Sequence, residues 1–345
     1  MLTMPTDTAA LPIADSQELG TLGILHIKRM WSRTLASQLR TEQMKIQPED
    51  WVKDNTLICG LGLGLRETMQ RLHERRPSIE QFEQWILEIN GGTISRDRIE
   101  RLNAALSGEW KTGPAPNPQD AAFSKHELSF WDENGYVVLH NAVPAENCSA
   151  AREAICQFLK MDMDDPNTWY GPTQGHSIWI PLLHHPTLDA NRHAPRIYKA
   201  FAQLWGRTDL WVTTDQSGMN PPERAGWKFP GPNLHWDVSI ALPIPFGVQG
   251  ILYLADTAPE QGAFCCVPGF HKKMDSWINS LPANSDPRGV DLSKEVIPIA
   301  GKSGDLIIWH HALPHGSSPN RAKLPRFVQY MTMRPSHWEM NPVWR

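Results

Sequence analysis

A histidine and an aspartate stand two residues apart in the segment NLHWDVS, at His235 and Asp237. In a β-strand, residues i and i+2 point to the same face, so this imidazole and this carboxylate would converge on one point. Two histidines and one carboxylate on one face of an octahedron are the ligands of non-haem Fe(II) oxygenases. The pair therefore predicts an iron site whose third ligand comes from a second strand, although a His-x-Asp triplet alone often occurs by chance.

The segment GDLIIWHHALPHGSSPN offers three histidines for the third ligand, and the spacing to an arginine favours His315. Oxygenases of this kind bind a dicarboxylate whose 2-oxo acid end chelates the iron, and its far carboxylate needs a fixed, two-pronged cation. Arg326 lies eleven residues after His315, beyond a Ser-Ser-Pro-Asn turn, on a strand expected to return beside it. Ser317 would add a hydroxyl to the same carboxylate.

Other polar and aromatic residues are secondary candidates. Gln249 and Tyr253 share one face of a predicted strand, where they would either hydrogen-bond 2-oxoglutarate or fill the interior of a barrel. His310 and His311 are predicted to pack in the core or to hydrogen-bond a metal ligand, and His271 to orient its loop. Two loop segments would either line a substrate pocket or cap the fold, with Trp169, Tyr170, His176, Trp179, Trp227 and Lys228.

Residues from about 125 to 335 resemble the phytanoyl-CoA dioxygenase family of Fe(II)- and 2-oxoglutarate-dependent oxygenases. The matching segments are FWDENGYVVLHNAVP, LHWD, ILYLADTAPEQGAFCCVPGFHK and GDLIIWHHALPHGSSPNRAKLPR. In the family pattern the distal histidine precedes Gly-Ser, which falls on His315, and the dicarboxylate arginine falls on Arg326. The resemblance implies a double-stranded β-helix (jelly roll), with Fe(II) as the metal, 2-oxoglutarate and O2 as co-substrates, and succinate and CO2 as products. Halogenating relatives replace the carboxylate ligand with a small residue, so Asp237 points to hydroxylation or a related oxidation.

From the motifs and this resemblance we expect a dioxygenase that oxidises a C–H bond of a small metabolite, and we favour hydroxylation as the outcome. One alternative is a cupin-type metal dioxygenase without 2-oxoglutarate, which would not need Arg326. A second alternative is a catalytically inactive jelly-roll binding module, which would not need the intact set of three ligands. The family name suggests an acyl-CoA substrate, but fold-level analogy does not choose among small metabolites.

Upstream of these motifs the chain is predicted to be helical. In LGILHIKRMWSRTLASQL, apolar residues recur at spacings of three and four, which is typical of an amphipathic helix. Ser78, followed by Gln81, predicts a helix start with a capping box. The run GLGLGL at 60–65 lacks the Lys-Ser/Thr of a phosphate-binding loop and predicts a turn or close packing between helices.

Four regions follow from these patterns: a flexible tail at 1–20, a helical N-terminal domain at 21–110, a Pro-rich linker at 111–120 and an oxygenase domain at 121–345. In the last region, short apolar runs alternate with Pro/Gly turns: GYVVLHNAV, LWVTTD, VSIAL, VQGILYLAD, AFCCVP, EVIPIAG, DLIIWHHAL and RFVQYMTMRP. Many short strands predict a barrel or sandwich. The expected class is mainly β: a jelly-roll core with flanking helices and a small helical domain.

Composition narrows the range of partners. With a net charge of −4, the chain lacks the surplus of basic residues that is typical of a nucleic-acid-binding protein. It also contains no run of about 18 apolar residues, so we expect no membrane span. Five cysteines without a C-x-x-C pair favour a reducing compartment, and the N-terminus lacks the pattern of a secretion signal, so we expect a cytoplasmic protein. The expected partner is a small-molecule substrate. The N-terminal domain is expected to serve as a lid, a homo-oligomer surface or a docking site for a carrier protein.

Overall fold

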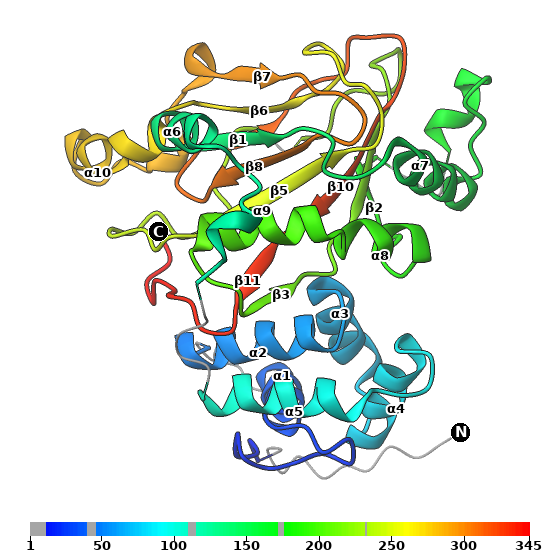
Figure 1. Ribbon diagram of the computed structural model, residues 1–345, viewed down its shortest axis with the longest axis vertical. Coiled ribbons are helices and arrows are strands. Elements are labelled where there is room, and N and C mark those ends of the chain that lie inside the picture. The colour runs from blue at the N-terminus through cyan, green and yellow to red at the C-terminus, as the bar shows by residue number, and fades with distance from the viewer. Residues whose placement is uncertain (1–11, 40–45, 110–114, 172–175, 232) are drawn as a thin grey trace. The chain divides into compact units, whose positions relative to one another are not determined.

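A computed structural model describes residues 12–39, 46–109, 115–171, 176–231 and 233–345 (Figure 1). The chain divides into two compact units. The first comprises Met1–Thr112 and Ser336–Trp338, and the second comprises Gly113–Pro335 and Glu339–Arg345. The sequence did not predict that three residues near the C-terminus belong with the first unit. Part of the predicted linker, residues 110–114, lies outside the described residues.

The first unit is helical in its described part. Its helices are α1 Ile27–Leu39, α2 Pro48–Gly60, α3 Leu65–Arg75, α4 Ile79–Ile89 and α5 Arg96–Ser107. The predicted capping box at the start of α4 is confirmed, because Ser78 Oγ accepts from the Gln81 amide and Gln81 Oε1 accepts from the Ser78 amide. The GLGLGL run forms the turn between α2 and α3, as expected for a helix–helix connection.

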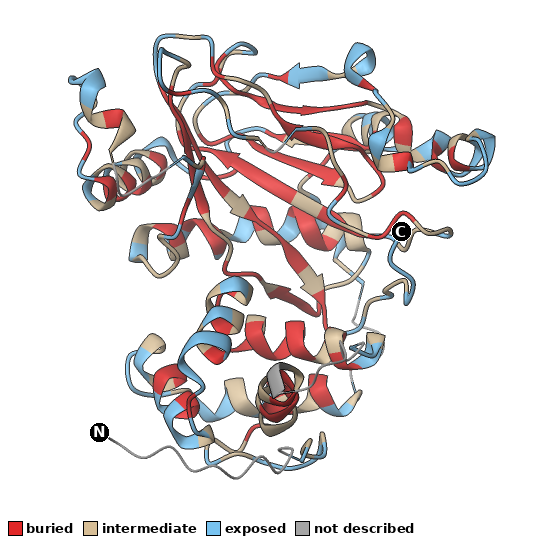
Figure 2. Ribbon diagram, turned by 180° about the vertical axis from the view of Figure 1, so that it is seen from behind, coloured by how far each residue is buried: buried red, intermediate tan, exposed pale blue. Residues whose placement is uncertain are grey.

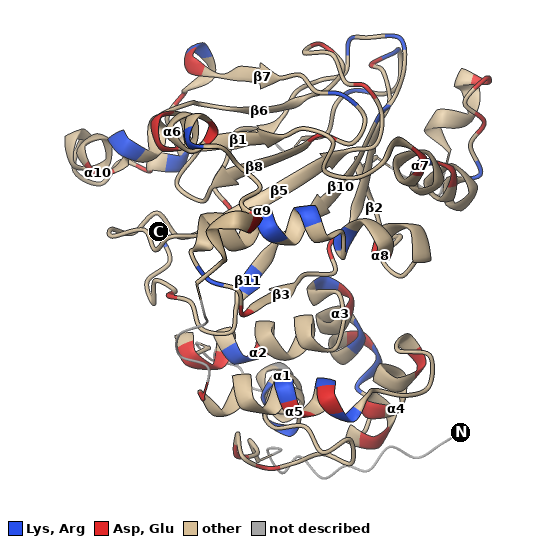
Figure 3. Cartoon of the chain, in the orientation of Figure 1, with Lys and Arg blue, Asp and Glu red and all other residues tan. Residues whose placement is uncertain are grey.

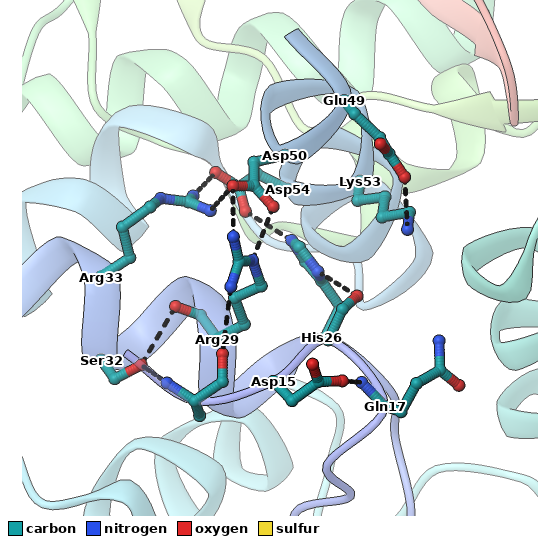
Figure 4. Close-up of polar contacts among 12 residues, drawn as sticks. Asp15, Gln17, His26, Arg29, Ser32, Arg33, Glu49, Asp50, Lys53 and Asp54 are labelled. Atoms are coloured by element: carbon teal, nitrogen blue, oxygen red, sulfur yellow. Dashed lines mark hydrogen bonds and ion pairs between the residues drawn. The ribbon is translucent and has the colours of Figure 1, made fainter. Parts of the chain in front are cut away.

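Two arginines and two aspartates face each other across α1 and α2 (Figure 4). Arg29 donates to both carboxylate oxygens of Asp50, at 2.7 and 2.9 Å, and Arg33 donates to Asp54. Residues four apart lie on one face of a helix, so each helix presents a matched pair of charges. His26 joins the cluster through Nε2, which lies 2.9 Å from Asp54 Oδ1. This largely buried cluster joins α1 to α2 and connects both helices to His26, which directly precedes α1.

Within the tail that the sequence predicts at residues 1–20, the described residues contact the start of α1. The Ser16 carbonyl accepts from the His26 amide at 2.9 Å, and Ser16 Oγ lies 2.9 Å from His26 Nδ1. This part of the tail is therefore held by the same histidine that reaches the charged cluster. Residues 1–11 lie outside the described residues.

The second unit combines helices with antiparallel sheets. Its helices are α6 Lys125–Asn134, α7 Ala145–Leu159, α8 Pro186–Arg192, α9 Pro195–Trp205 and α10 Phe270–Ser280. Its strands are β1 Tyr136–Leu139, β2 Trp179–Ile180, β3 Leu210–Val212, β4 Ser217–Asn220, β5 Val248–Tyr253, β6 Phe264–Cys266, β7 Ile297–Ile299, β8 Leu306–His310, β9 His315–Ser317, β10 Arg326–Met331 and β11 Met333–Pro335. They form a six-stranded sheet in the order β1-β8-β5-β10-β4-β2, a three-stranded sheet β7-β6-β9, and the pair β11-β3.

Alternate residues of the six-stranded sheet feed two separate cores. On β5, Leu252 belongs to the core shared with α7, α8 and α9, whereas Ile251 and Tyr253 belong to the core shared with β6, β7 and α10. This is the two-residue periodicity of a strand buried on both faces. The helices α8 and α9 accordingly lie on one side of the sheet in Figure 1, and its strands are almost wholly buried in Figure 2. Strands β1, β5 and β8 carry no charged side chain (Figure 3).

Two predictions about the fold are wrong. The described chain mixes helices and sheets, so the class is not mainly β; amphipathic helices form most of the first unit and flank the sheets of the second. The segment VSIAL, residues 238–242, is not a strand. Its apolar residues include the fully buried Ile240, but the segment has no partner strand to complete a hydrogen-bonded ladder.

Among the described residues, no helix combines the length and the apolar character that crossing a membrane would require.

Candidate metal centre

The two histidines of the predicted site come from segments 80 residues apart and are paired through their main chains. The His235 amide donates to the His315 carbonyl at 2.9 Å, and the His315 amide donates to the His235 carbonyl at 3.0 Å. His315 begins β9, whereas His235 lies in an extended segment and forms only an isolated bridge. Directly opposed residues of this kind bring side chains together, and the two imidazole centres lie 4.7 Å apart.

Main-chain carbonyls fix the tautomer of both imidazoles. His235 Nδ1 lies 2.7 Å from the Asn233 carbonyl oxygen, and His315 Nδ1 lies 3.0 Å from the Leu313 carbonyl oxygen. A carbonyl oxygen can only accept, so each Nδ1 carries a proton and donates. The Nε2 atom of each neutral ring then presents a lone pair, as a metal-ligating histidine requires.

Asp237 faces both Nε2 atoms. Its Oδ1 lies 3.3 Å from His235 Nε2, and its Oδ2 lies 3.3 Å from His315 Nε2. One ligand atom from each of the three residues lies within 4.8 Å of the others, and the described residues contain no second cluster of this kind. Three acceptors that converge in this way repel one another unless a cation or a shared proton lies between them. The donor set, two imidazoles and one carboxylate, fits a divalent iron ion.

Burial and neighbouring side chains shift the pKa values of Asp237 and His235, and the lowered pKa of Asp237 is the shift expected of a carboxylate that binds a cation. Burial raises the pKa of Asp237, but without a metal the contacts with His235 and His315, whose Nε2 atoms donate once the rings take up a second proton, and the hydrogen bond from Gln249 outweigh it and hold that pKa far below its usual value. Burial lowers the pKa of His235, but its contact with Asp237 outweighs this and raises the pKa above its usual value. The Asp237 carboxylate is therefore ionised at physiological pH. Protons then compete with a metal mainly at His235, whose pKa is raised.

Gln249, predicted on the interior face of β5, reaches the carboxylate ligand. Its Nε2 donates to Asp237 Oδ2 at 2.7 Å, and its Oε1 is buried without a partner among the described residues. A neutral amide donor leaves the carboxylate charge intact while restricting its rotation. Gln249 therefore contacts the Asp237 carboxylate, and its predicted contact with 2-oxoglutarate stays a prediction.

Arg326 is fully buried at the start of β10, a central strand of the six-stranded sheet. Its Nη1 donates to the Gly262 carbonyl at 2.8 Å and to Ser317 Oγ at 2.9 Å. Its Nε and Nη2 are buried without hydrogen-bond partners, and no carboxylate of the described residues pairs with it. An ionised group buried without a counter-ion is costly. A guanidinium with two free donors, beside the serine two residues after His315, is built to receive an anionic group.

Tyr253 lies on the same interior face, but its hydroxyl is already used by the main chain. It donates to the Ile299 carbonyl at 2.7 Å and accepts from the Phe264 amide at 2.9 Å. The side chain thus joins β5 to β6 and β7 and holds the two sheets in register. Its predicted hydrogen bond to 2-oxoglutarate stays a prediction.

The three secondary histidines lie outside the cluster of metal ligands. His310 Nδ1 accepts from the Ala312 amide at 2.9 Å, and burial lowers the pKa of His310 to about 4. Burial also lowers the pKa of His311, to about 3. His271 Nε2 donates to the Asp132 carbonyl at 3.0 Å, which ties α10 to α6. Burial lowers the pKa of His271 as well.

Part of the predicted aromatic loop assembles around one tryptophan. The Trp227 ring lies 6.0 Å from Tyr170 and 5.6 Å from His176. Trp169 is buried in the core that the six-stranded sheet shares with α7, α8 and α9, and its Nε1 donates to the Asp162 carbonyl. Trp179 lies on β2 and is half exposed, Lys228 is exposed, and residues 172–175 lie outside the described residues.

Sequence reasoning missed one residue beside the site. Arg288 donates from Nη1 to the Trp236 carbonyl at 2.8 Å and from Nη2 to the Val238 carbonyl at 2.6 Å. Trp236 and Val238 are the residues immediately before and after Asp237. It lies in a short 3-10 turn, Pro287–Gly289, where no periodic or motif signal marks it.

Comparison with known proteins gives a match over the region that holds this site. The family profile "Phytanoyl-CoA dioxygenase" matches residues 131–328. A Dictyostelium discoideum protein that carries the phytanoyl-CoA dioxygenase name is 22% identical over 260 residues, which cover 60% of this chain and 74% of that protein. The ectoine dioxygenase of Sphingopyxis alaskensis is 22% identical over 251 residues, which cover 66% of this chain and 78% of that enzyme.

The solved structures that resemble the chain are distant. The non-haem, α-ketoglutarate-dependent carbocyclase SnoK of nogalamycin biosynthesis is 18% identical, with a TM-score of 0.47 over 67% of this chain and 90% of its own. HygX of Streptomyces hygroscopicus, solved with nickel and 2-oxoglutarate bound, is 17% identical, with a TM-score of 0.44 over 62% of this chain and 88% of its own.

Proposed function

The chain belongs to the phytanoyl-CoA dioxygenase family, and from this premise we propose which of its residues perform the chemistry. As a member it is a non-haem iron dioxygenase that uses Fe(II), 2-oxoglutarate and O2. His235, Asp237 and His315 hold the iron. Arg326 binds the distal carboxylate of 2-oxoglutarate, and Ser317 adds its hydroxyl to the same group.

The convergence of three acceptor atoms is the observation that carries this assignment. The Nε2 lone pairs of His235 and His315 face the oxygens of Asp237, and a divalent cation satisfies all three at once. Metal bound there supplies the redox chemistry that couples oxidative decarboxylation of 2-oxoglutarate to oxidation of a substrate C–H bond. The carbonyls of Asn233 and Leu313 keep the Nδ1 protons in place, so both imidazoles stay oriented toward the metal.

Arg326 supports 2-oxoglutarate as the co-substrate. It is fully buried and keeps two donors free, and its Ser317 partner lies two residues from His315 on β9. A carboxylate that accepts from Nε and Nη2 would satisfy these donors and neutralise the charge. A metal dioxygenase without a dicarboxylate co-substrate has no use for a buried, unpaired guanidinium. The contact with Ser317 favours a co-substrate that extends from the iron toward Arg326.

The remaining proposals concern the fold and the reaction. The six-stranded and three-stranded sheets form a double-stranded β-helix, within an oxygenase domain at residues 121–345. The reaction is hydroxylation of a C–H bond in a small metabolite, since Asp237 keeps the carboxylate ligand that halogenating relatives lack. The helical N-terminal domain serves as a lid, an oligomer surface or a docking site for a carrier protein.

Co-substrate turnover tests this function without knowledge of the substrate. The full chain with Fe(II) and O2 is expected to convert 2-oxoglutarate slowly to succinate, and addition of Fe(II) and 2-oxoglutarate without O2 is expected to give a charge-transfer band in the visible range. Asp237→Ala should lose both signals, whereas His311→Ala, the matched control, should keep both. Absence of succinate formation and of the absorbance band in the wild-type chain would refute the proposal.

A further inference from the structure

The carboxylate ligand lies in a segment without a strand partner. The sequence predicts a strand at 238–242, but the structure forms none there, and Asp237 itself is half exposed. In a β-ladder, main-chain hydrogen bonds would fix the peptide planes and so the direction of the side chain. Here the main-chain carbonyls need other donors, because buried polar groups of the main chain are almost always paired.

Arg288 supplies these donors on both sides of the ligand. Its Nη1 lies 2.8 Å from the Trp236 carbonyl and its Nη2 lies 2.6 Å from the Val238 carbonyl. These carbonyls belong to the residues immediately before and after Asp237, and the planar guanidinium holds them in a fixed relation. Arg288 therefore restrains the peptide plane between Trp236 and Asp237, which joins the Asp237 Cα directly, and the plane between Val238 and Ser239, one peptide further on.

The same guanidinium reaches the C-terminal segment. Nε and Nη2 of Arg288 lie 3.2 and 2.9 Å from the Arg345 carbonyl oxygen, and the guanidinium lies 5.1 Å from the centre of the Trp344 ring. Ser239 Oγ donates to the Val343 carbonyl at 2.6 Å. Residues 341–345 thus cover the ligand segment on the side where a neighbouring strand would otherwise lie.

The anchor of Arg288 is local and rigid. Asp286 Oδ1 accepts from the Arg288 amide at 2.9 Å, and the buried Pro287 begins the 3-10 turn. Within the segment, the Trp236 indole is buried against α10 and donates to the Ala312 carbonyl at 3.0 Å. The ligand segment is therefore held by a fixed indole and a fixed guanidinium.

We propose that Arg288 is a positioning residue that orients the Asp237 carboxylate for metal binding by clamping the main-chain carbonyls on either side of it. This inference rests on the proposed function. The clamp acts on the ligand segment directly, and the C-terminal segment acts only as a cover. Arg288 does not touch the metal or the co-substrate.

Binding of Co(II) to the full, metal-free chain tests the proposal with readouts that need no turnover. Arg288→Gln is expected to weaken Co(II) binding by about 10- to 100-fold, as loss of outer contacts to metal ligands usually does, and to change the visible spectrum of bound Co(II) as the carboxylate loses its orientation. Arg288→Lys should recover only part of the affinity, because one ammonium cannot restrain two carbonyls as a fork does. Amide hydrogen exchange of residues 236–242 should become faster in Arg288→Gln.

Two control variants separate the clamp from general effects. Arg196→Gln removes an exposed arginine that also donates to a main-chain carbonyl, that of His140, and should bind Co(II) like the wild type. Asn341→Ala loosens the C-terminal segment, because Asn341 Nδ2 donates to the Ala241 carbonyl at 2.8 Å, but it spares the two bonds of Arg288. It is expected to leave the affinity and spectrum of Co(II) nearly unchanged.

Each result decides one proposal. Failure of the wild-type chain to bind Co(II) would overturn the proposed function. Wild-type binding with equal affinity and spectrum in Arg288→Gln would overturn the clamp alone, as would an Asn341→Ala variant that weakens Co(II) as much as Arg288→Gln. Should Arg288→Gln fail to fold, the affinity and spectrum of Arg288→Lys decide, and values equal to the wild type would refute the clamp.

Discussion

Replacing Arg326 with methionine removes a charge while keeping a side chain of similar length. In the proposed complex this arginine donates Nε and Nη2 to the distal carboxylate of 2-oxoglutarate, and both donors are buried and free in the structure. Loss of one partner from a buried charge pair costs about 2–5 kcal/mol in binding. Since 1.4 kcal/mol is a factor of ten, the dissociation constant of 2-oxoglutarate should rise by roughly 30- to 4,000-fold.

Smaller changes should give a graded series. Arg326→Lys keeps a point charge without the fork and should fall between the wild type and Arg326→Met. Ser317→Ala removes one hydroxyl next to Arg326 Nη1 and should cost about 0.5–1.5 kcal/mol, or roughly 2- to 12-fold in affinity. Calorimetric titration of 2-oxoglutarate into the Co(II)-loaded chain measures all of these. Co(II) binding itself should be unchanged in each variant, because none of them is a metal ligand.

Thermal melting gives an independent measurement. A ligand at 100 times its dissociation constant stabilises by about 2.7 kcal/mol, which for a unit of this size is roughly 5–11 °C. At the same concentration, Arg326→Met should gain at most about 3 °C. Without 2-oxoglutarate this variant should melt no lower than the wild type, because replacing a buried, uncompensated charge with an apolar group is often neutral or stabilising.

The reasoning would be wrong if Arg326→Met bound 2-oxoglutarate within about threefold of the wild type while Co(II) binding stayed intact. Full recovery of affinity in Arg326→Lys would show that a point charge suffices and that the two free donors of the guanidinium have no special role.

Other predictions concern the ligands and the first unit. His315→Ala should lose Co(II) affinity and His311→Ala should keep it; the reverse in a metal titration would mean that the wrong histidine was chosen. Because the pKa of His235 is raised and that of Asp237 is lowered, their ion pair stabilises the metal-free chain most between about pH 4 and 6.5. The advantage of wild type over His235→Gln in melting temperature should therefore shrink as the pH rises through the raised histidine pKa, or falls below 4, while metal affinity rises with pH; a pH-independent difference would contradict this. A chain that begins at Ala121 should still bind Co(II) and 2-oxoglutarate, since all proposed ligands lie downstream; a soluble truncation that binds neither would show that the first unit completes the site.

The sequence signals for the three proposed metal ligands are local. The i, i+2 spacing of His235 and Asp237 places both side chains on one face, and this holds in an extended segment with a single bridge as it does in a strand. The choice of His315 depends on a spacing to Arg326, which reflects the return of one strand beside another. Both signals come from residue types and short distances along the chain.

The contacts that orient Asp237 could not be predicted in this way. Gln249 reaches Asp237 from 12 residues away; the strand pattern predicts its interior position but not this contact. Arg288 binds the carbonyls on either side of Asp237, and no period or motif marks its position. The strand predicted at 238–242 failed for a related reason. Apolar residues such as Ile240 indicate burial, but whether a strand or an irregular segment covers them is decided by residues far along the chain, here the C-terminal segment that donates and accepts at Ser239.

The two kinds of ligand are held by different parts of the protein, and this sets how the site can change during evolution. The main chains and Nδ1 atoms of His235 and His315 are hydrogen-bonded to main-chain atoms: each other's peptide groups and the carbonyls of Asn233 and Leu313. An exchange of a neighbouring side chain leaves these main-chain hydrogen bonds in place. The carboxylate depends on two replaceable side chains, so divergence at Gln249 or Arg288 would retune the coordination of the metal while its histidine frame stays where it is.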